Sequence, residues 1–149
     1  MKKVLCGGFL SLMFLVACAS SQPKECVDGN CTDGTGTASY EGDRYVGSFK
    51  GTQRAGVGEY VWKKGDRYKG AWADGKRSGQ GDYSFSEGDT YAGEYKDNVR
   101  NGKGTYVWKS GDRYVGDWKD GLMDGEGTLT KADGRIFTGR FEKNRYLGK

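Results

Sequence analysis

The chain has 149 residues, with 24 Lys and Arg against 20 Asp and Glu, 27 Gly, one Pro and no His. Its aromatic content of 13% is too high for a disordered chain, and its glycines do not recur at every third position as they do in collagen. Acidic and basic residues alternate without a run of one sign, so the composition gives no indication of nucleic-acid binding.

The chain begins with the features of a signal peptide. Lys2 and Lys3 form a short basic stretch, and residues 4–16 are apolar apart from a few small residues. This apolar stretch is shorter than a membrane-spanning helix. A cleaved signal peptide over residues 1–17 is therefore the better interpretation.

Residues 15–18 (Leu-Val-Ala-Cys) resemble the lipobox of bacterial lipoproteins. The resemblance implies cleavage before Cys18 and acylation of that residue, so that acyl chains such as palmitate anchor the mature chain in a membrane. Ala19 stands where an Asp would resemble an inner-membrane retention signal, so the resemblance favours the outer membrane, with the side of that membrane left open. An ordinary signal peptide with a chance cysteine is the alternative.

Residues 18–33 are predicted to form a lipidated cysteine, a polar tether and a small disulfide loop. Beyond the lipobox the chain has two cysteines, Cys26 and Cys31. An exported chain meets an oxidising compartment, in which an even pair of cysteines indicates a disulfide. A redox-active or metal-binding pair is the alternative, although a chain without His lacks a usual zinc ligand. The sequence therefore predicts no metal and no cofactor.

The remaining residues, 34–149, repeat with a period of 23. An aromatic residue recurs at this spacing, and a glycine follows it two positions later. Such a period indicates small units that cannot fold alone and that stack on their neighbours. About five units are expected. The aromatic positions are Tyr45, Tyr68, Tyr91, Tyr114 and Phe137, and the glycines are Gly47, Gly70, Gly93, Gly116 and Gly139.

Each repeat has the pattern of a β-hairpin. Residues 58–63 and residues 67–72 both alternate between aromatic and other side chains, which is a strand pattern. The turn between them contains Gly65, and the glycines at this position in every repeat are expected to need positive φ. Residues 73–78 are expected to lead from one hairpin to the next.

Stacked hairpins predict an all-β fold, a single elongated antiparallel sheet in which equivalent residues form columns. The glycine column leaves room for aromatic rings of adjacent strands. Part of the aromatic face must be core, so packing and a semi-exposed binding groove are both open for any one ring. The candidate binding face comprises Tyr60, Trp62, Tyr68, Trp72, Tyr83, Phe85, Tyr91, Tyr95, Tyr106, Trp108, Tyr114 and Trp118.

The repeated pattern Tyr-x-Gly-x-aromatic-x-x-Gly resembles the MORN (membrane occupation and recognition nexus) repeat over about residues 34–148. Residues 68–75 and 114–121 match it closely, whereas Thr52 and Asn98 replace the last glycine in two other units. The resemblance implies an elongated sheet of hairpins. It also implies kinship with proteins described as phospholipid-binding, as scaffolds or as dimerisation modules.

The sequence offers little catalytic chemistry, because without His the acid–base steps would fall to carboxylates or lysines. The aspartates follow the 23-residue period and are interpreted as turn residues, so no catalytic residue and no enzyme activity are predicted. Arg44, Arg67 and Arg113 follow the turn glycines and are candidate contacts to an anionic surface, although Thr90 interrupts their row. Solvated charges are the alternative.

These features predict a lipid-anchored, non-catalytic scaffold or protein-interaction module in the bacterial cell envelope. Its partners would be the membrane, through the lipid, and another envelope protein. The alternative is direct binding of phospholipid headgroups or envelope polysaccharide through an aromatic and basic face. Homodimer formation is left open.

Overall fold

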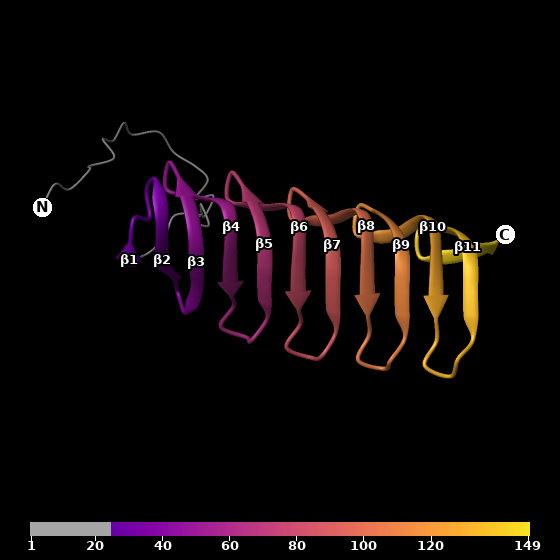
Figure 1. Cartoon of the computed structure of the whole chain (residues 1–149). Helices are drawn as coiled ribbons and strands as arrows, with labels where there is room; N and C mark the ends of the chain where they lie inside the picture. Colours follow the sequence, from indigo (N-terminus) through magenta and orange to yellow (C-terminus); the bar gives the residue numbers. More distant parts are fainter. Residues whose placement is uncertain (1–24) are drawn as a thin grey trace, which may run out of the picture.

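The structure, a computed structural model, describes residues 25–149. In this part of the chain it consists of twelve β-strands and no helix, and each strand pairs antiparallel with the next (Figure 1). The expected single elongated antiparallel sheet is thereby confirmed. The strands are β1 (Glu25–Gly29), β2 (Gly34–Tyr40), β3 (Asp43–Lys50), β4 (Gln53–Val61), β5 (Arg67–Ala73), β6 (Lys76–Ser84), β7 (Thr90–Lys96), β8 (Val99–Val107), β9 (Arg113–Lys119), β10 (Leu122–Thr130), β11 (Ile136–Glu142) and β12 (Arg145–Gly148).

Two kinds of turn alternate along the sheet. The longer turn joins β4 to β5, where the amide of Gly65 donates to the carbonyl of Trp62 at 2.8 Å. Gly65 has a φ of +98°, as expected, and the equivalent glycines share this sign. The shorter turn joins β5 to β6 through Asp74 and Gly75, whose φ angles are +49° and +75°. Two positive φ angles in a two-residue loop identify a type I′ turn, whose twist suits a continuous sheet.

The shorter turns correct one expectation. Residues 73–78 were expected to connect separate hairpins, but β5 continues to Ala73 and β6 begins at Lys76, so the pairing is continuous through every unit. Thr52 and Asn98 occupy the place of the turn glycine and keep positive φ angles of +67° and +73°. The strand pattern is hidden here because no aromatic residue occupies the first three positions of β4, β6, β8 or β10.

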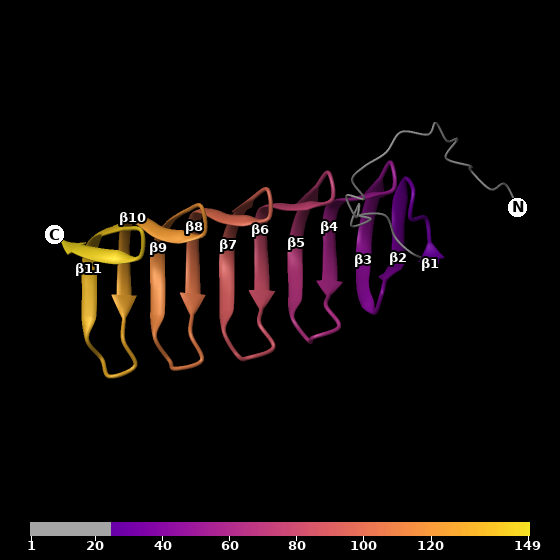
Figure 2. The same cartoon turned by 180° about the vertical axis from the view of Figure 1, so that it is seen from behind.

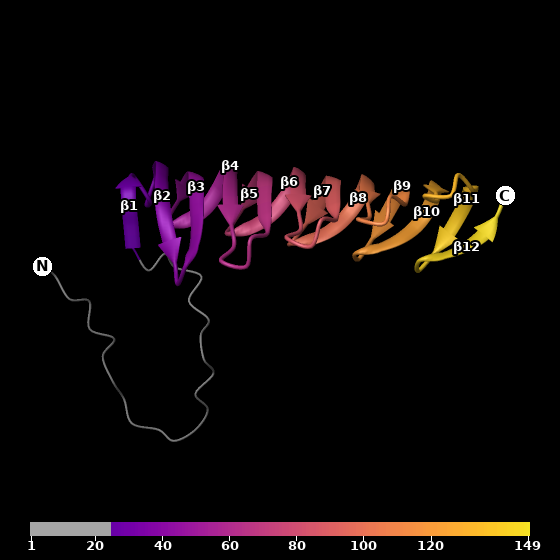
Figure 3. The same ribbon diagram turned by 90° about the horizontal axis from the view of Figure 1, so that it is seen from below.

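A bulge bends each of the strands β4, β6, β8 and β10. Between β3 and β4 the register shifts after Gly47, which leaves Gly56 and Val57 without partners in β3. Because the strand bends there, the guanidinium of Arg54 lies 4.9 Å from the ring centroid of Tyr60. Six residues of straight strand would separate the two by about 20 Å. Figure 3 shows segments of β6, β8 and β10 running obliquely across the row, and Figure 2 shows them from behind.

The core lies on the inside of this bend, on the aromatic face of the sheet. The side chains of Tyr45, Tyr68, Tyr91 and Tyr114 are fully buried there. Neighbouring rings meet edge to face, as between Tyr68 and Trp72 with centroids 5.2 Å apart. Such pairs add about 0.5–1.5 kcal/mol to the burial of the rings. The bend therefore replaces the second layer that a flat sheet would need.

Both ends of the sheet differ from the repeat. At the first end a disulfide joins Cys26 in β1 to Cys31, whose side chain is buried. The carboxylate of Asp33, in the same loop, accepts the amide of Gly51 at 2.9 Å and so attaches the loop to the first short turn. At the other end, the hydroxyl of Tyr146 in β12 donates to a carbonyl oxygen of β11 at 2.8 Å. These contacts attach the terminal strands to the rest of the sheet.

Candidate functional site

The aromatic columns form the core, which corrects most of the candidate binding face. Nine of the twelve rings are buried, and only Trp62, Phe85 and Trp108 are partly exposed. The physical reason is the bend, which folds each strand over the rings that a flat sheet would leave open. The buried rings are Tyr60, Tyr68, Trp72, Tyr83, Tyr91, Tyr95, Tyr106, Tyr114 and Trp118.

The repeated tyrosine explains the repeated glycines. The Tyr68 ring lies over Gly70 in its own strand and over Gly81 in the next strand, as the small column predicted. A Cβ added to Gly70 would lie 2.6 Å from the Tyr68 hydroxyl oxygen, which is too close for any side chain. The hydroxyl itself donates to the carbonyl of Ala71 at 2.9 Å. Burial raises the pKa of Tyr68 to about 12, so the phenol stays neutral and remains a donor at physiological pH.

The three partly exposed rings pack on the core along one side. Trp62 lies 4.6 Å from Tyr60, and Trp108 lies 4.6 Å from Tyr106, measured between ring centroids. Phe85 is 4.3 Å from Tyr83 in the repeat between them. This row continues the core toward the longer turns. Its edges are accessible, but its faces are largely occupied by neighbouring rings.

The structure adds a column of arginines that the sequence reading missed. Arg54, Arg77 and Arg100 stand 23 residues apart, and each guanidinium lies within 6 Å of several core rings. Arg77 also donates to the carbonyl of Asn98 in the next short turn at 2.8 Å. Their spacing of 23 residues is visible in the sequence and could have identified them as part of the repeat. At the next position Met123 replaces the arginine.

The repeated aspartates are turn residues, as predicted, and they also bind tyrosines of the core. Asp66 accepts the hydroxyl of Tyr83 at 2.5 Å and the amide of Ser86 at 3.0 Å. Burial alone would raise the pKa of Asp66, but these bonds and the Lys64 ammonium 2.7 Å away hold that pKa well below its usual range. In the last unit Lys131 donates to Asp112, where no tyrosine is present.

The predicted basic row lies on the other face of the sheet. Arg67 precedes the buried Tyr68 in β5, so its side chain points away from the core, and it pairs with Glu59 at 2.8 Å. Arg44 and Arg113 occupy equivalent exposed positions in β3 and β9. The candidate aromatic and anionic-contact residues therefore do not form one surface.

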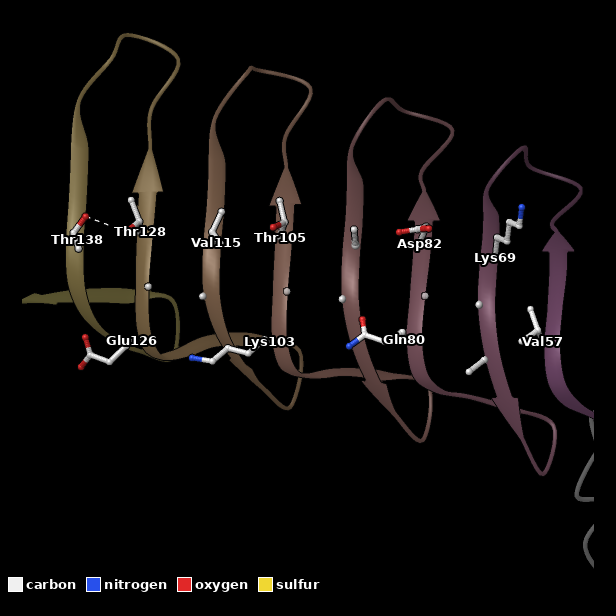
Figure 4. A pocket seen from close by; sticks show the side chains of 18 residues that line it. Val57, Lys69, Gln80, Asp82, Lys103, Thr105, Val115, Glu126, Thr128 and Thr138 are labelled. Atoms are coloured by element: carbon white, nitrogen blue, oxygen red, sulfur yellow. Dashed lines mark hydrogen bonds between the residues drawn. The ribbon is translucent and has the colours of Figure 1, made fainter.

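That opposite face carries an open groove of about 1160 Å³, which crosses the strands from β4 to β11. None of its eighteen lining residues is aromatic, and six are glycines: Gly70, Gly81, Gly93, Gly104, Gly116 and Gly127. Figure 4 shows two rows of side chains on either side of the glycine positions. The first row is Lys69, Asp82, Ala92, Thr105, Val115, Thr128 and Thr138, and the second row is Val57, Ala71, Gln80, Lys103 and Glu126.

The chemistry changes along the groove. Lys69 and Asp82 face each other in the register of β5 and β6, yet they form no ion pair. From Ala92 to Thr138 the first row is uncharged. In the second row Lys103 pairs with Asp117 at 2.5 Å, and the exposed Glu126 forms no ion pair among the described residues.

The predicted signal peptide, 1–17, and Cys18 lie outside the described residues, as do residues 19–24. Within residues 25–149, no helix is long and apolar enough to span a membrane. The same residues contain no group of three or more His, Cys, Asp or Glu side chains that could hold a metal ion.

Comparison with models of protein families gives four consecutive matches, each described as a MORN repeat, at residues 45–67, 68–90, 91–113 and 114–134. Together they cover more than half of the chain. The fifth unit that the period predicts, which begins at Phe137, lies outside the matched segments. A search of curated protein sequences finds none that matches the chain.

Proposed function

The chain belongs to the MORN repeat family, and from that premise we propose that it is a non-catalytic protein-interaction or scaffold module of the bacterial cell envelope. The groove across β4–β11 carries this proposal. It is a long, shallow surface with varied polar and aliphatic walls, which suits recognition of another macromolecule. Its lining offers no nucleophile paired with a base, which hydrolytic or transfer chemistry would need.

We further propose that a lipid on Cys18 holds this module at the outer membrane. The support is the resemblance of residues 15–18 to a lipobox and the absence of an Asp after the cysteine. The disulfide between Cys26 and Cys31 fits the same compartment, because disulfides persist where the environment is oxidising. In this arrangement the groove would be presented a short tether away from the membrane.

Direct binding of lipid headgroups or polysaccharide through a joint aromatic and basic face has lost its support. The rings are mostly core, and Arg44, Arg67 and Arg113 stand on the opposite side of the sheet. A protein partner at the groove is the function that the geometry favours.

Site-specific photocrosslinking in cells tests the proposed partner. A photoreactive amino acid at Val57, Thr105 or Thr128 should give one defined protein adduct. The exposed positions Ala73 and Ala132 lie off the groove and serve as controls. Equal adducts from groove and control positions, or only abundant neighbours, would count against a partner at the groove.

The anchor is tested by Cys18→Ser. Metabolic labelling with an acyl-chain analogue should mark the wild-type chain and not the variant, and the variant should leave the membrane fraction. Retention of the acyl label on Cys18→Ser would overturn the lipobox interpretation. This result is independent of the groove.

A further inference from the structure

The shape and the charges of the groove restrict which part of a protein partner can bind there, a conclusion that rests on the proposed function. The lining residues come from eight neighbouring strands, β4 to β11. At a strand spacing of about 4.8 Å the groove is about 34 Å long, and its two rows stand two residues apart on the same strand, as Gln80 and Asp82 do, which is about 6.6 Å. An α-helix is about 10–12 Å across with its side chains, which is wider than the spacing of the two rows. A single extended chain is the polypeptide form that fits.

The length of the groove sets the length of this occupant. An extended chain advances about 3.3 Å per residue, so about ten residues would cross from β4 to β11. The backbone of the floor is already paired within the sheet, as between Gly81 and its partners Gly70 and Gly93. Polar contacts to an occupant must therefore come from side chains of the two rows.

Three polar side chains at one end of the groove lack partners. Among the described residues, the side chains of Lys69, Gln80 and Asp82 make no hydrogen bond and no ion pair. Lys69 and Asp82 face each other across adjacent strands, at a distance where opposite charges usually attract. A chain lying between the rows could pair with both, an acidic residue against Lys69 and a basic residue against Asp82.

The rest of the first row would contact a different type of side chain in the bound peptide. From Ala92 through Thr105 and Val115 to Thr138 it presents small or β-branched groups without charge. The side chains of Thr128 and Thr138 bond to each other at 3.0 Å, which leaves fewer polar groups for a ligand. Burying a charge against this stretch would leave it unpaired, which is unfavourable. Uncharged small or β-branched side chains match this part of the groove.

Other occupants fit less well. The accessible charges at the groove are of both signs, whereas an anionic lipid surface would require an excess of positive charge. The absence of aromatic lining leaves a glycan without the flat ring faces on which bases and sugars commonly stack. A second copy of the chain could also bind groove to groove. It would place Lys69 and Asp82 either against the uncharged first row of the second copy or against Lys69 and Asp82 of that copy.

We propose that the groove binds one extended polypeptide segment of about ten residues, in which an acidic residue, a basic residue and a stretch of small or β-branched residues follow one another, in either chain direction. The order is fixed because Asp82, on β6, adjoins the uncharged stretch that begins on β7, and Lys69, on β5, lies beyond it. The basic residue of the ligand therefore lies next to its uncharged stretch, and the acidic residue lies outside.

Synthetic peptides test this order. Two labelled ten-residue peptides are compared, one with Glu-x-Lys before a stretch of Val, Thr and Ser, and one with Lys-x-Glu before the same stretch. Each is also made with the sequence reversed, since the chain direction in the groove is not specified. Binding to purified residues 25–149, which form the whole described domain, is measured by fluorescence anisotropy at low salt. The Glu-x-Lys peptides should bind about tenfold more tightly than the Lys-x-Glu peptides, a difference in binding free energy of about 1.4 kcal/mol.

A paired charge exchange provides the decisive variant. Lys69→Asp combined with Asp82→Lys keeps the net charge and changes only exposed side chains, so the fold should persist. This variant should prefer the Lys-x-Glu order by a similar factor. Ala92→Trp, in the middle of the groove, should abolish binding of both peptides, and Ala73→Trp, at an exposed position outside the lining, should not.

Three results would overturn the proposal: no binding of any of these peptides, equal affinity for both charge orders, or a preference that the charge exchange leaves unchanged. Binding of vesicles that contain phosphatidylglycerol, blocked by Ala92→Trp while the peptides fail to bind, would assign the groove to lipid instead. If crosslinks from the groove to a folded protein persist while the peptides fail, the proposed function stands and this inference alone is wrong.

Discussion

The two faces of the sheet differ in how closely their residues repeat, although the same strands form both. On the core face, the contacts of Tyr68 recur at Tyr91, and those of Arg77 recur at Arg100. On the groove face, one repeat position carries four chemistries, namely Val57, Gln80, Lys103 and Glu126. The face that holds the fold together cannot vary without loss of packing, whereas the face toward solvent can. Differences between repeats are therefore the place to look for specificity.

The largest effect should come from a core tyrosine. Tyr91→Ala removes a buried ring that lies over Gly93 and Gly104, and truncation of a buried aromatic residue costs about 3–5 kcal/mol. Urea unfolding of residues 25–149 would measure the free energy of unfolding. Tyr91→Phe, which removes only the bond to the Glu94 carbonyl, should cost about 1 kcal/mol. A loss below 1 kcal/mol for Tyr91→Ala would contradict the assignment of these rings to the core.

The buried aspartate should give the next effect, and it should depend on pH. Asp66→Asn weakens charge-assisted hydrogen bonds worth about 1.5–3 kcal/mol at neutral pH. The folded-state pKa of Asp66 is depressed, so its stabilisation is fully present above the unfolded value of about 3.9 and is lost as the pH falls through the folded value. The gap between wild type and variant should be full at pH 7 and shrink below pH 4. A gap that stays constant to pH 2.5 would be inconsistent with this.

The arginine column should give a smaller effect. Arg77→Met copies the residue that replaces arginine at Met123, keeps a long apolar side chain over the rings and loses the bond to the Asn98 carbonyl. A loss of about 1–2 kcal/mol is expected in urea unfolding. Lys76→Met serves as control, because it breaks only the exposed pair with Asp97, worth under about 1 kcal/mol. Equal losses in both variants would show that the column adds nothing beyond surface pairing.

The smallest effect should come from the groove face. Thr105→Ala changes a partly exposed side chain without a hydrogen bond among the described residues, so its free energy of unfolding should stay within about 0.5 kcal/mol of wild type. The same urea assay applies. A loss as large as that of Arg77→Met would erase the distinction between the two faces.

The sequence was sufficient for the fold because the period marks strands and turns independently. Tyr68, Gly70 and Gly65 each recur, and each has one physical requirement that only a few residue types meet. The sequence was insufficient for the surfaces. Alternation shows which side chains share a face, but not that Trp72 and Tyr95 would be covered by a bend at the bulge. That bend depends on where the register shifts, at glycines of positive φ such as Gly56 and Gly79, whose part in a bulge the sequence interpretation did not assign.

The arginines were missed for a related reason. Arg54 and Arg77 look like ordinary solvated charges in an alternating sequence, and only their contacts with the rings of other strands, such as Trp72 and Tyr95, reveal their role. Period alone could have separated them from Arg67, whose column is interrupted by Thr90. The groove had no comparable signal, because its positions follow the 23-residue period but carry different residue types from repeat to repeat.

The link from each arginine to the next short turn has a consequence for how such a chain can change. Arg54 reaches the carbonyl of Gly75, and Arg100 reaches that of Gly121, in both cases 21 residues ahead. Deleting a whole unit brings an equivalent turn under the same arginine, whereas deleting part of one leaves the guanidinium without its acceptor. Length can thus be gained or lost in steps of two strands, about 10 Å each, and the reach of the molecule is adjustable by recombination between units.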